Sequence, residues 1–410
     1  MSFNPLEQKG VPLDQQLRNW SELNVEPYDK NTIHPYSRSR VIVLNGIEVE
    51  SIIFGHQFNR RTDNVEIKNA LALARRVDQQ QQKAINWLSP GDETPLETTI
   101  GYEQVAIDLT AWVARNEPDP YVKQTLDFGL LEDFDHLYRY ANLYELINGQ
   151  RAEELTQDLT EIMPGRPTFV EHRHPADDVR RHFDRHTVDP LTRMHVMSIT
   201  AGEQQTMNFY MNHGPDFMEP IARGLYLEIA MIEEQHVTQY ESLLDPLTSW
   251  LEDLVFHKYN EVYMYHSFME DETDDRRLQQ LWELHLNMEI EQLKEACRLL
   301  AKFEGKDAME ILPPELPLGV KFQSNKDYVR LVLAEQIDLR ADGPDYVPLD
   351  ALAPNHRYFD YQKTVNAGGN PTEQVIELNR EAQGREYRLQ PDGEHPIADL
   401  REPAGTGAGR

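Results

Sequence analysis

The sequence predicts a mainly α-helical protein with a four-helix bundle at its centre. From about residue 98 to 305 the apolar residues recur with a helical period, and the helical stretches are 20 to 30 residues long. Short breaks rich in proline and glycine separate them, which is typical of antiparallel helical bundles. The expected helices cover about 98–116, 120–148, 190–212, 216–244, 246–270 and 273–304.

The first four of these helices form the expected bundle, and the last two form an added helical hairpin. We therefore assign residues 96–305 to one helical domain with an insertion at 150–189 that is rich in histidine and arginine. Proline residues 118, 120 and 246 mark helix boundaries, and Asn148-Gly149 resembles a helix C-cap.

The two ends of the chain have less regular patterns. Residues 1–95 form a mixed segment, in which β-branched runs around Asn45-Gly46 predict a β-hairpin at 41–55 and residues 65–89 read as a helix. Residues 306–410 are rich in proline and predict an irregular arm, with a disordered end at EPAGTGAGR. Because a long irregular segment commonly covers a neighbouring subunit, we expect a homo-oligomer.

Composition excludes several classes of function. A formal charge of −30 and a pI near 4.8 argue against a nucleic-acid partner. No apolar run reaches the length of a membrane span, and the N-terminus lacks the pattern of a signal peptide, so we expect a cytoplasmic protein without a membrane partner. Cys297 is the single cysteine, which excludes a disulfide framework and a cysteine-ligated zinc or iron–sulfur site. A metal held by oxygen and imidazole ligands remains open.

A repeated set of carboxylates and histidines carries the strongest functional signal. The distance along the chain from Glu103 to Asp133 is thirty positions, and so is the distance from Glu203 to Glu233. In both halves a histidine follows the second acidic residue three positions later. The six residues are Glu103, Asp133, His136, Glu203, Glu233 and His236.

Helix geometry brings these residues to one place. Residues i and i+3 share a helix face, so each carboxylate–histidine pair can present two ligands to one point. The other helix of each antiparallel hairpin adds a glutamate, and two packed hairpins direct four carboxylates and two imidazoles at the bundle axis. Because unpaired buried carboxylates cost several kcal/mol each, two divalent ions bridged by carboxylates are expected there.

The pattern resembles the ferritin-like superfamily of di-metal carboxylate proteins, and its internal repeat is most similar to rubrerythrin-type bundles. The resemblance covers about 98–245. It implies that Glu103 and Glu203 are terminal ligands, that Asp133 and Glu233 bridge two metals, and that the two histidines are terminal imidazole ligands. It further implies two iron ions as the cofactor, with two manganese ions or a mixed manganese–iron pair as alternatives.

The sequence departs from that family in ways that leave alternatives open. The first half has Asp133 where the family usually has glutamate, and the adjacent Glu132 could serve instead. Glu233-Glu234 raises the same ambiguity in the second half. A single cysteine rules out a rubredoxin module, so electrons must come from an external donor or from the substrate.

Other interpretations compete with the metal centre. The six residues could form a buried salt-bridge network in a metal-free scaffold. Tyr140 and Tyr240, one turn beyond the histidines, could support the site or simply fill the core. In the insertion, His182 and His186 could bind a separate metal with Asp184 or His174, or belong to a basic rim. A rival bundle would use Glu203, Glu233, His236, His285 and Glu289.

The function expected from the resemblance is that of a non-haem di-iron oxidoreductase that activates dioxygen or peroxide and oxidises a small organic substrate. One alternative is a peroxidase or a manganese catalase-like enzyme that removes peroxide. Another is a non-catalytic iron-binding protein of the ferritin kind.

Overall fold

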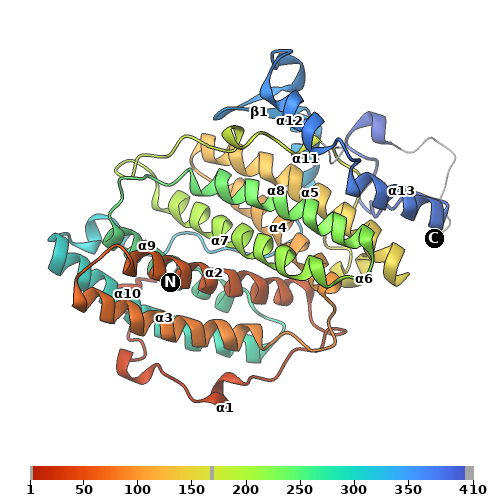
Figure 1. Cartoon of the computed structure of the whole chain (residues 1–410). Coiled ribbons are helices and arrows are strands. Elements are labelled where there is room, and N and C mark those ends of the chain that lie inside the picture. Colours follow the sequence, from red (N-terminus) through yellow and green to blue (C-terminus); the bar gives the residue numbers. More distant parts are fainter. Residues whose placement is uncertain (1–2, 167–169, 402–410) are drawn as a thin grey trace.

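The computed structural model describes residues 3–166 and 170–401 and is mainly helical (Figure 1). Its eight long helices form two groups of four that lie side by side. The central bundle consists of α4 (Pro95–Asn116), α5 (Pro120–Asn148), α7 (Pro190–His213) and α8 (Pro220–Glu241). The flanking bundle consists of α2 (Pro35–Asn59), α3 (Val65–Asn86), α9 (Trp250–Asp271) and α10 (Arg276–Glu304). The mainly helical class and the expected helices of residues 98–304 are confirmed.

Local sequence signals explain where these helices begin and end. Thr94 and Ser249 form capping boxes with the glutamates three residues later, at the starts of α4 and α9. Asp119 and Asp189 cap α5 and α7, each followed by a proline in the first helical turn. Gly149 ends α5 in the left-handed conformation, with φ of 67°.

The predicted β-hairpin at 41–55 is wrong, because this segment lies inside the helix α2. Val41, Val43 and Ile47 are buried between helices instead of pairing in a sheet. Gly46 serves close packing here and not a turn: a Cβ on it would lie 3.2 Å from the backbone oxygen of Ala201 in α7 and closer still to the side chain of Gln205. The expected helix at 65–89 is present as α3.

The last helical hairpin packs with the two long helices of the N-terminal segment. Helices α9 and α10 pack against each other and against α2 and α3, so the N-terminal segment completes a second four-helix group. Contacts of α2 with α4 and α7, and of α9 with α7, join the two bundles. One apolar core extends through the flanking bundle to this junction, and a second lies in the central bundle.

The C-terminal arm is more regular than the sequence predicted. It contains α11 (Lys326–Gln336), the antiparallel strands β1 (Leu339–Asp342) and β2 (Asp345–Pro348), α12 (Arg357–Val365) and α13 (Pro371–Gln383). α11 packs on α4 and α5, and α13 packs on α5 and α8. The amphipathic pattern of these short helices was obscured by the prolines between them. The expected disordered end, EPAGTGAGR, lies outside the described residues.

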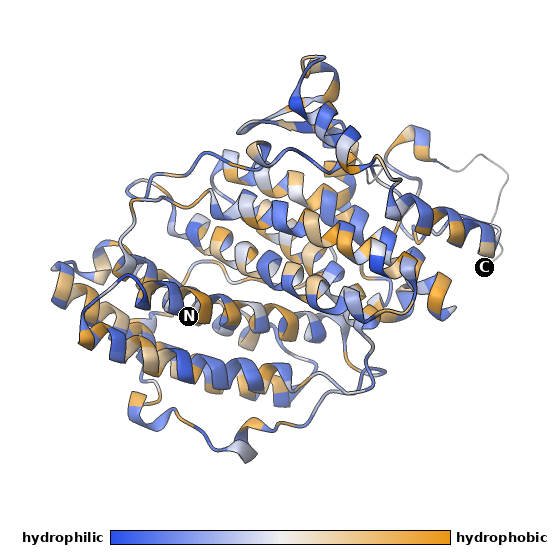
Figure 2. Cartoon of the chain, viewed as in Figure 1, coloured by the Kyte–Doolittle hydropathy of each residue, from blue (hydrophilic) through white to orange (hydrophobic). Residues whose placement is uncertain are grey.

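Short elements complete the chain. α1 (Trp20–Leu23) precedes the flanking bundle. α6 (Glu153–Thr156) lies near the start of the insertion at 150–189, whose described residues also include a 3-10 helix at Pro175–Asp177. Hydrophilic and hydrophobic positions alternate along the long helices (Figure 2). Within the described ranges, no helix combines the length and the apolar character that crossing a membrane requires.

Candidate metal centre

All four helices of the central bundle contribute side chains to one buried cluster. α4 carries Glu103 and α7 carries Glu203, while α5 and α8 carry the pairs Asp133/His136 and Glu233/His236. Each of the six side chains is at most 5% exposed. The structure therefore brings together the six residues that the repeated spacing singled out.

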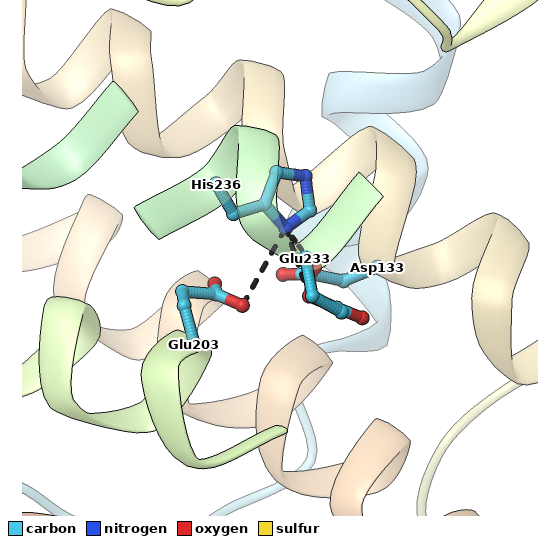
Figure 3. Close-up of side chains that lie close together, drawn as sticks. All are labelled: Asp133, Glu203, Glu233 and His236. Atoms are coloured by element: carbon cyan, nitrogen blue, oxygen red, sulfur yellow. Dashed lines mark hydrogen bonds and ion pairs between the residues drawn. The ribbon is translucent and has the colours of Figure 1, made fainter. Parts of the chain in front are cut away.

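The six residues form two groups that have Glu233 in common. Glu103, His136 and Glu233 offer ligand atoms that lie within 4.8 Å of one another, and so do Asp133, Glu203, Glu233 and His236. Figure 3 shows the second group, in which the Nδ1 atom of His236 faces three carboxylates. Its distances are 3.5 Å to Asp133 Oδ1, 3.4 Å to Glu203 Oε2 and 3.2 Å to Glu233 Oε2.

Glu233 has the geometry of a bridging carboxylate. Its Oε1 atom lies 3.0 Å from Nδ1 of His136, and its Oε2 atom lies on the His236 side. The two imidazole rings stack at a centroid distance of 5.8 Å. Each ring thus directs Nδ1 at the carboxylates between the helices and Nε2 away from them.

Several atoms of the cluster have no hydrogen-bond partner among the described residues, although they are buried. They are Glu103 Oε2, both carboxylate oxygens of Asp133 and both ring nitrogens of His136. No lysine or arginine of the described part of the chain forms an ion pair with the four inner carboxylates. Four ionised carboxylates carry four negative charges, which two divalent cations would neutralise, so the donor set fits a two-metal centre.

The protonation of the cluster reflects the same crowding of charge. Burial raises the pKa of Glu103 to about 8 and that of Glu203 to about 7, and it raises the pKa of Asp133 well above its usual range. Burial alone would lower the pKa of His136 and His236, but Glu233 and Glu203 outweigh it and raise both pKa values. Without a bound cation the cluster retains protons that a metal would displace.

A second layer of carboxylates lies near the outer nitrogen of each histidine, and the one at His236 is within hydrogen-bond distance. Nε2 of His236 lies 2.8 Å from Glu132 Oε2, and Nε2 of His136 lies 3.6 Å from Glu171 Oε2. Such carboxylates fix the orientation of a ligating imidazole and raise its basicity. Both are paired with arginine: Arg173 donates to the two oxygens of Glu132, and Arg139 lies 2.8 Å from Glu171.

Sequence reasoning missed the role of the insertion. Glu171, Arg173 and Arg166 all lie in the segment 150–189, and Arg166 also donates to Glu132, at 3.2 Å. This segment lacks periodicity, so its contacts could not be read from the chain. The high arginine and histidine content of the segment was the only indication of a role, and it suggested a basic rim. Arg173 is instead buried against Glu132.

The geometry distinguishes the adjacent acidic residues Glu132 and Asp133, and likewise Glu233 and Glu234. Asp133 faces Nδ1 of His236 inside the cluster, whereas Glu132 faces the outer Nε2 atom and two arginines. Glu233 is buried inside the cluster, whereas Glu234 is exposed. The geometry therefore favours Asp133 and Glu233 as the inner carboxylates.

Several buried tyrosines lie near the cluster. Tyr140 and Tyr240 are fully buried, and neither hydroxyl has a hydrogen-bond partner in the described ranges. Tyr140 packs against Tyr210 and Tyr226. Tyr210, which the sequence analysis did not select, donates its hydroxyl hydrogen to Glu103 Oε1.

The remaining candidate residues lie elsewhere. His182 makes a contact with the backbone oxygen of Phe183, and His186 is exposed; neither belongs to a group that could hold a metal among the described residues. His285 and Glu289 belong to the flanking bundle. The rival bundle built from α7 to α10 is therefore wrong.

A pocket leads from the surface toward this centre. It has a volume of about 300 Å³ and lies between α2, α4 and α7. A second, smaller cavity reaches Glu203, and Tyr102 and Gln205 line both cavities. Gln205 Nε2 donates to the Tyr102 hydroxyl at 2.5 Å. The polar wall includes two titratable side chains, Glu93 and His213, and the uncharged side chains Asn45, Asn86, Ser89, Thr98, Asn208 and Asn212.

Comparisons with known proteins add no relative: no family model, no curated protein and no solved structure matches this chain. The site is therefore interpreted from its own geometry.

Proposed function

We propose that this protein is a ferritin-like, non-haem di-iron oxidoreductase that activates dioxygen or peroxide and oxidises a small organic substrate. The observation that carries the proposal is the pair of buried ligand groups joined by Glu233. A single metal would not need six inward-facing ligands, and a salt-bridge network would pair the inner carboxylates with lysine or arginine. Two iron(II) ions held by these carboxylates and histidines would supply the reducing chemistry for dioxygen or peroxide, and an external donor or the substrate would provide further electrons.

The protein's own residues have separate tasks in this proposal. Glu132 and Glu171 keep the imidazole rings oriented with Nδ1 toward the inner carboxylates. Tyr210 holds Glu103 in place through its hydroxyl group. The buried aromatic residues around Tyr140 keep water away from the site.

The pocket favours an organic substrate over peroxide alone. A volume of about 300 Å³ is at the lower end of small-molecule binding sites and far exceeds what peroxide needs. Its asparagines together with Phe209 suit a small molecule that combines hydrogen-bonding groups with an apolar or aromatic part. Displacement of Gln205 from Tyr102 would connect the pocket with the cavity at Glu203.

The decisive experiment measures metal per chain by mass spectrometry, on protein purified without a metal-binding tag and reconstituted anaerobically with iron(II). We expect two iron ions per chain in the native protein and a loss of both in Glu233→Gln. Glu234→Gln is the matched control, since its exposed side chain lies outside the cluster and should leave the metal content unchanged. Absence of metal from the native protein would overturn the proposal. Two manganese ions with peroxide-dependent oxygen release would favour the catalase-like alternative.

A further inference from the structure

A second buried cluster of acidic side chains lies in the flanking bundle. Each of its four helices contributes one carboxylate: Glu48 from α2, Asp78 from α3, Glu261 from α9 and Glu289 from α10. All four are at most 1% exposed. One inward carboxylate per helix is the arrangement that Glu103, Asp133, Glu203 and Glu233 have in the central bundle.

The spacing along the chain repeats in the first half of the flanking bundle, whereas in the second half Glu289 follows Glu261 by twenty-eight positions. Asp78 follows Glu48 by thirty positions, the distance that separates Glu103 from Asp133 and Glu203 from Glu233. Three positions after Asp78 comes Gln81, and three positions after Glu289 comes Gln292. Glutamine therefore stands in both places where the central bundle has its histidines.

A lysine lies among the carboxylates of the flanking bundle. The Nζ atom of Lys258 is 2.9 Å from Asp78 Oδ2, 2.7 Å from Glu261 Oε2 and 3.2 Å from Glu289 Oε2. Its side chain is 3% exposed. An ammonium group has three hydrogen-bond donors, and here it lies close to three carboxylates contributed by three helices.

We infer that the flanking bundle is an internal copy of the central four-helix arrangement in which the ammonium group of Lys258 takes the place of the metal ions. A divalent cation bound by Asp78 and Glu261 would lie about 2 Å from their oxygens, in the space that Nζ fills, and would be repelled by its charge. The chain thus has one metal centre for two bundles, and the flanking bundle supports it as a scaffold fixed by a built-in cation.

The other groups of the cluster agree with an ammonium-filled site. Tyr265 donates its hydroxyl hydrogen to Glu48, and burial raises the pKa of both Glu48 and Glu289 well above the usual range, so that protons reduce the remaining negative charge. His285 contacts the Tyr265 hydroxyl with Nδ1 and Arg18 with Nε2, which leaves neither ring nitrogen directed at the carboxylates.

The cluster retains the donor atoms of a metal site. Glu48 Oε2, Asp78 Oδ1 and Glu261 Oε1 have no hydrogen-bond partner among the described residues, and the three side chains offer ligand atoms within 4.8 Å of one another. Both amide atoms of Gln81 are likewise unpartnered within the described ranges. Removal of the lysine should therefore convert the copy into a metal-binding site.

The test compares manganese(II) uptake per chain, measured by mass spectrometry after dialysis, in the native protein and in Lys258→Met, which keeps the side-chain volume but removes the charge. We expect Lys258→Met to bind one manganese ion more than the native protein, whatever number the central bundle holds. Adding Glu261→Gln to the Lys258→Met protein should abolish this gain. Lys258→Arg is the control that retains a cation and should gain no metal.

Two results would overturn the inference. One is a folded Lys258→Met protein, judged by circular dichroism, that gains no manganese. The other is a native protein that loses manganese when Asp78→Asn and Glu261→Gln are introduced, since the flanking bundle would then already hold a metal. This second comparison retains Lys258, so it decides the question even if Lys258→Met does not fold. If the central site binds no metal, the manganese content of the native protein is lower, but the gain of one ion expected for Lys258→Met is unchanged.

Discussion

Adjacent residues can have different roles at the candidate site, as Asp133 and Glu132 illustrate. Asp133 faces the cluster with both oxygens free of hydrogen bonds to described residues, whereas Glu132 joins Arg173 to the outer nitrogen of His236. We predict that Asp133→Asn abolishes binding of at least one metal, while Glu132→Gln weakens affinity by about 10- to 100-fold without changing the number of ions. Competition titrations with a chelator distinguish the two outcomes. Equal losses in the two variants would contradict the assignment.

The arginine that supports Glu132 is also the residue whose removal should cost most stability. Arg173 is 2% exposed and contacts Glu132 and Asp178. Because Arg173→Met removes the ion-pair partner of the buried Asp178 and one of the two arginines that contact Glu132, we expect a loss of about 3–5 kcal/mol in the free energy of unfolding. Arg181→Met is the control, since the Arg181–Asp345 pair is more than half exposed and contributes about 0–1 kcal/mol. Urea unfolding of both variants checks the difference, and similar losses would count against a buried role for Arg173.

At the scale of elements, α2 packs closely against α7 because Gly46 has no side chain. A methyl group at Gly46 would press on Gln205, which is buried and donates to Tyr102. We predict that Gly46→Ala destabilises the protein by about 1–3 kcal/mol, since overpacking outweighs the gain in helix propensity. Gly202→Ala in α7 is the matched control: a Cβ there meets no described atom within 4 Å, so it should stabilise by about 0.5–1 kcal/mol. Thermal unfolding measures both, and a stabilising Gly46→Ala would show that α2 can move away from α7.

The same helix shows what could be predicted from the sequence and what could not. The long helices of residues 95–304 follow from periodicity and caps, which act locally. Asn45-Gly46 is a hairpin signal in isolation, but tertiary packing decides its state, because the residues on both sides are buried in a helix between two bundles. Reading α2 as a hairpin concealed the register from Glu48 to Asp78.

The candidate site was predictable to the extent that it follows helix periodicity. Six residues at repeated spacing on long helices converge as expected, because a helix fixes which side chains share a face. The supporting residues Glu171 and Arg173 come from a loop that crosses the bundle, and loop paths depend on contacts between distant residues. Lys258 could not be recognised as a substitute cation before α9 was known to pack with α2 and α3.

For the whole molecule, the formal charge of −30 is accompanied by carboxylates buried in several helices. Burial raises the pKa of Glu50, Asp108 and Asp253 to about 7 in each case. These groups lie in α2, α4 and α9, and such a carboxylate is protonated in the folded protein but ionised in the unfolded chain between about pH 4.5 and pH 7. Unfolding then releases a proton, so each group lowers stability as the pH rises through this range.

Glu50 allows this effect to be isolated. Its Oε2 atom is buried without a hydrogen-bond partner in the described part of the chain, and Glu241 adds like-charge repulsion to the effect of burial. We predict that Glu50→Gln and the native protein are about equally stable near pH 4.5. The variant's advantage should grow to about 1–3 kcal/mol by pH 7 and then remain constant, because a glutamine has no proton to lose. Urea unfolding at intervals from pH 4.5 to 8.5, at matched metal content, measures the difference.

Glu283→Gln, at an exposed position of α10, is the control, and its stability difference from the native protein should not grow with pH in this way. A pH-independent difference for Glu50→Gln would mean that Glu50 is ionised in the folded protein throughout, and a cation close to Glu50 would then have to compensate its charge.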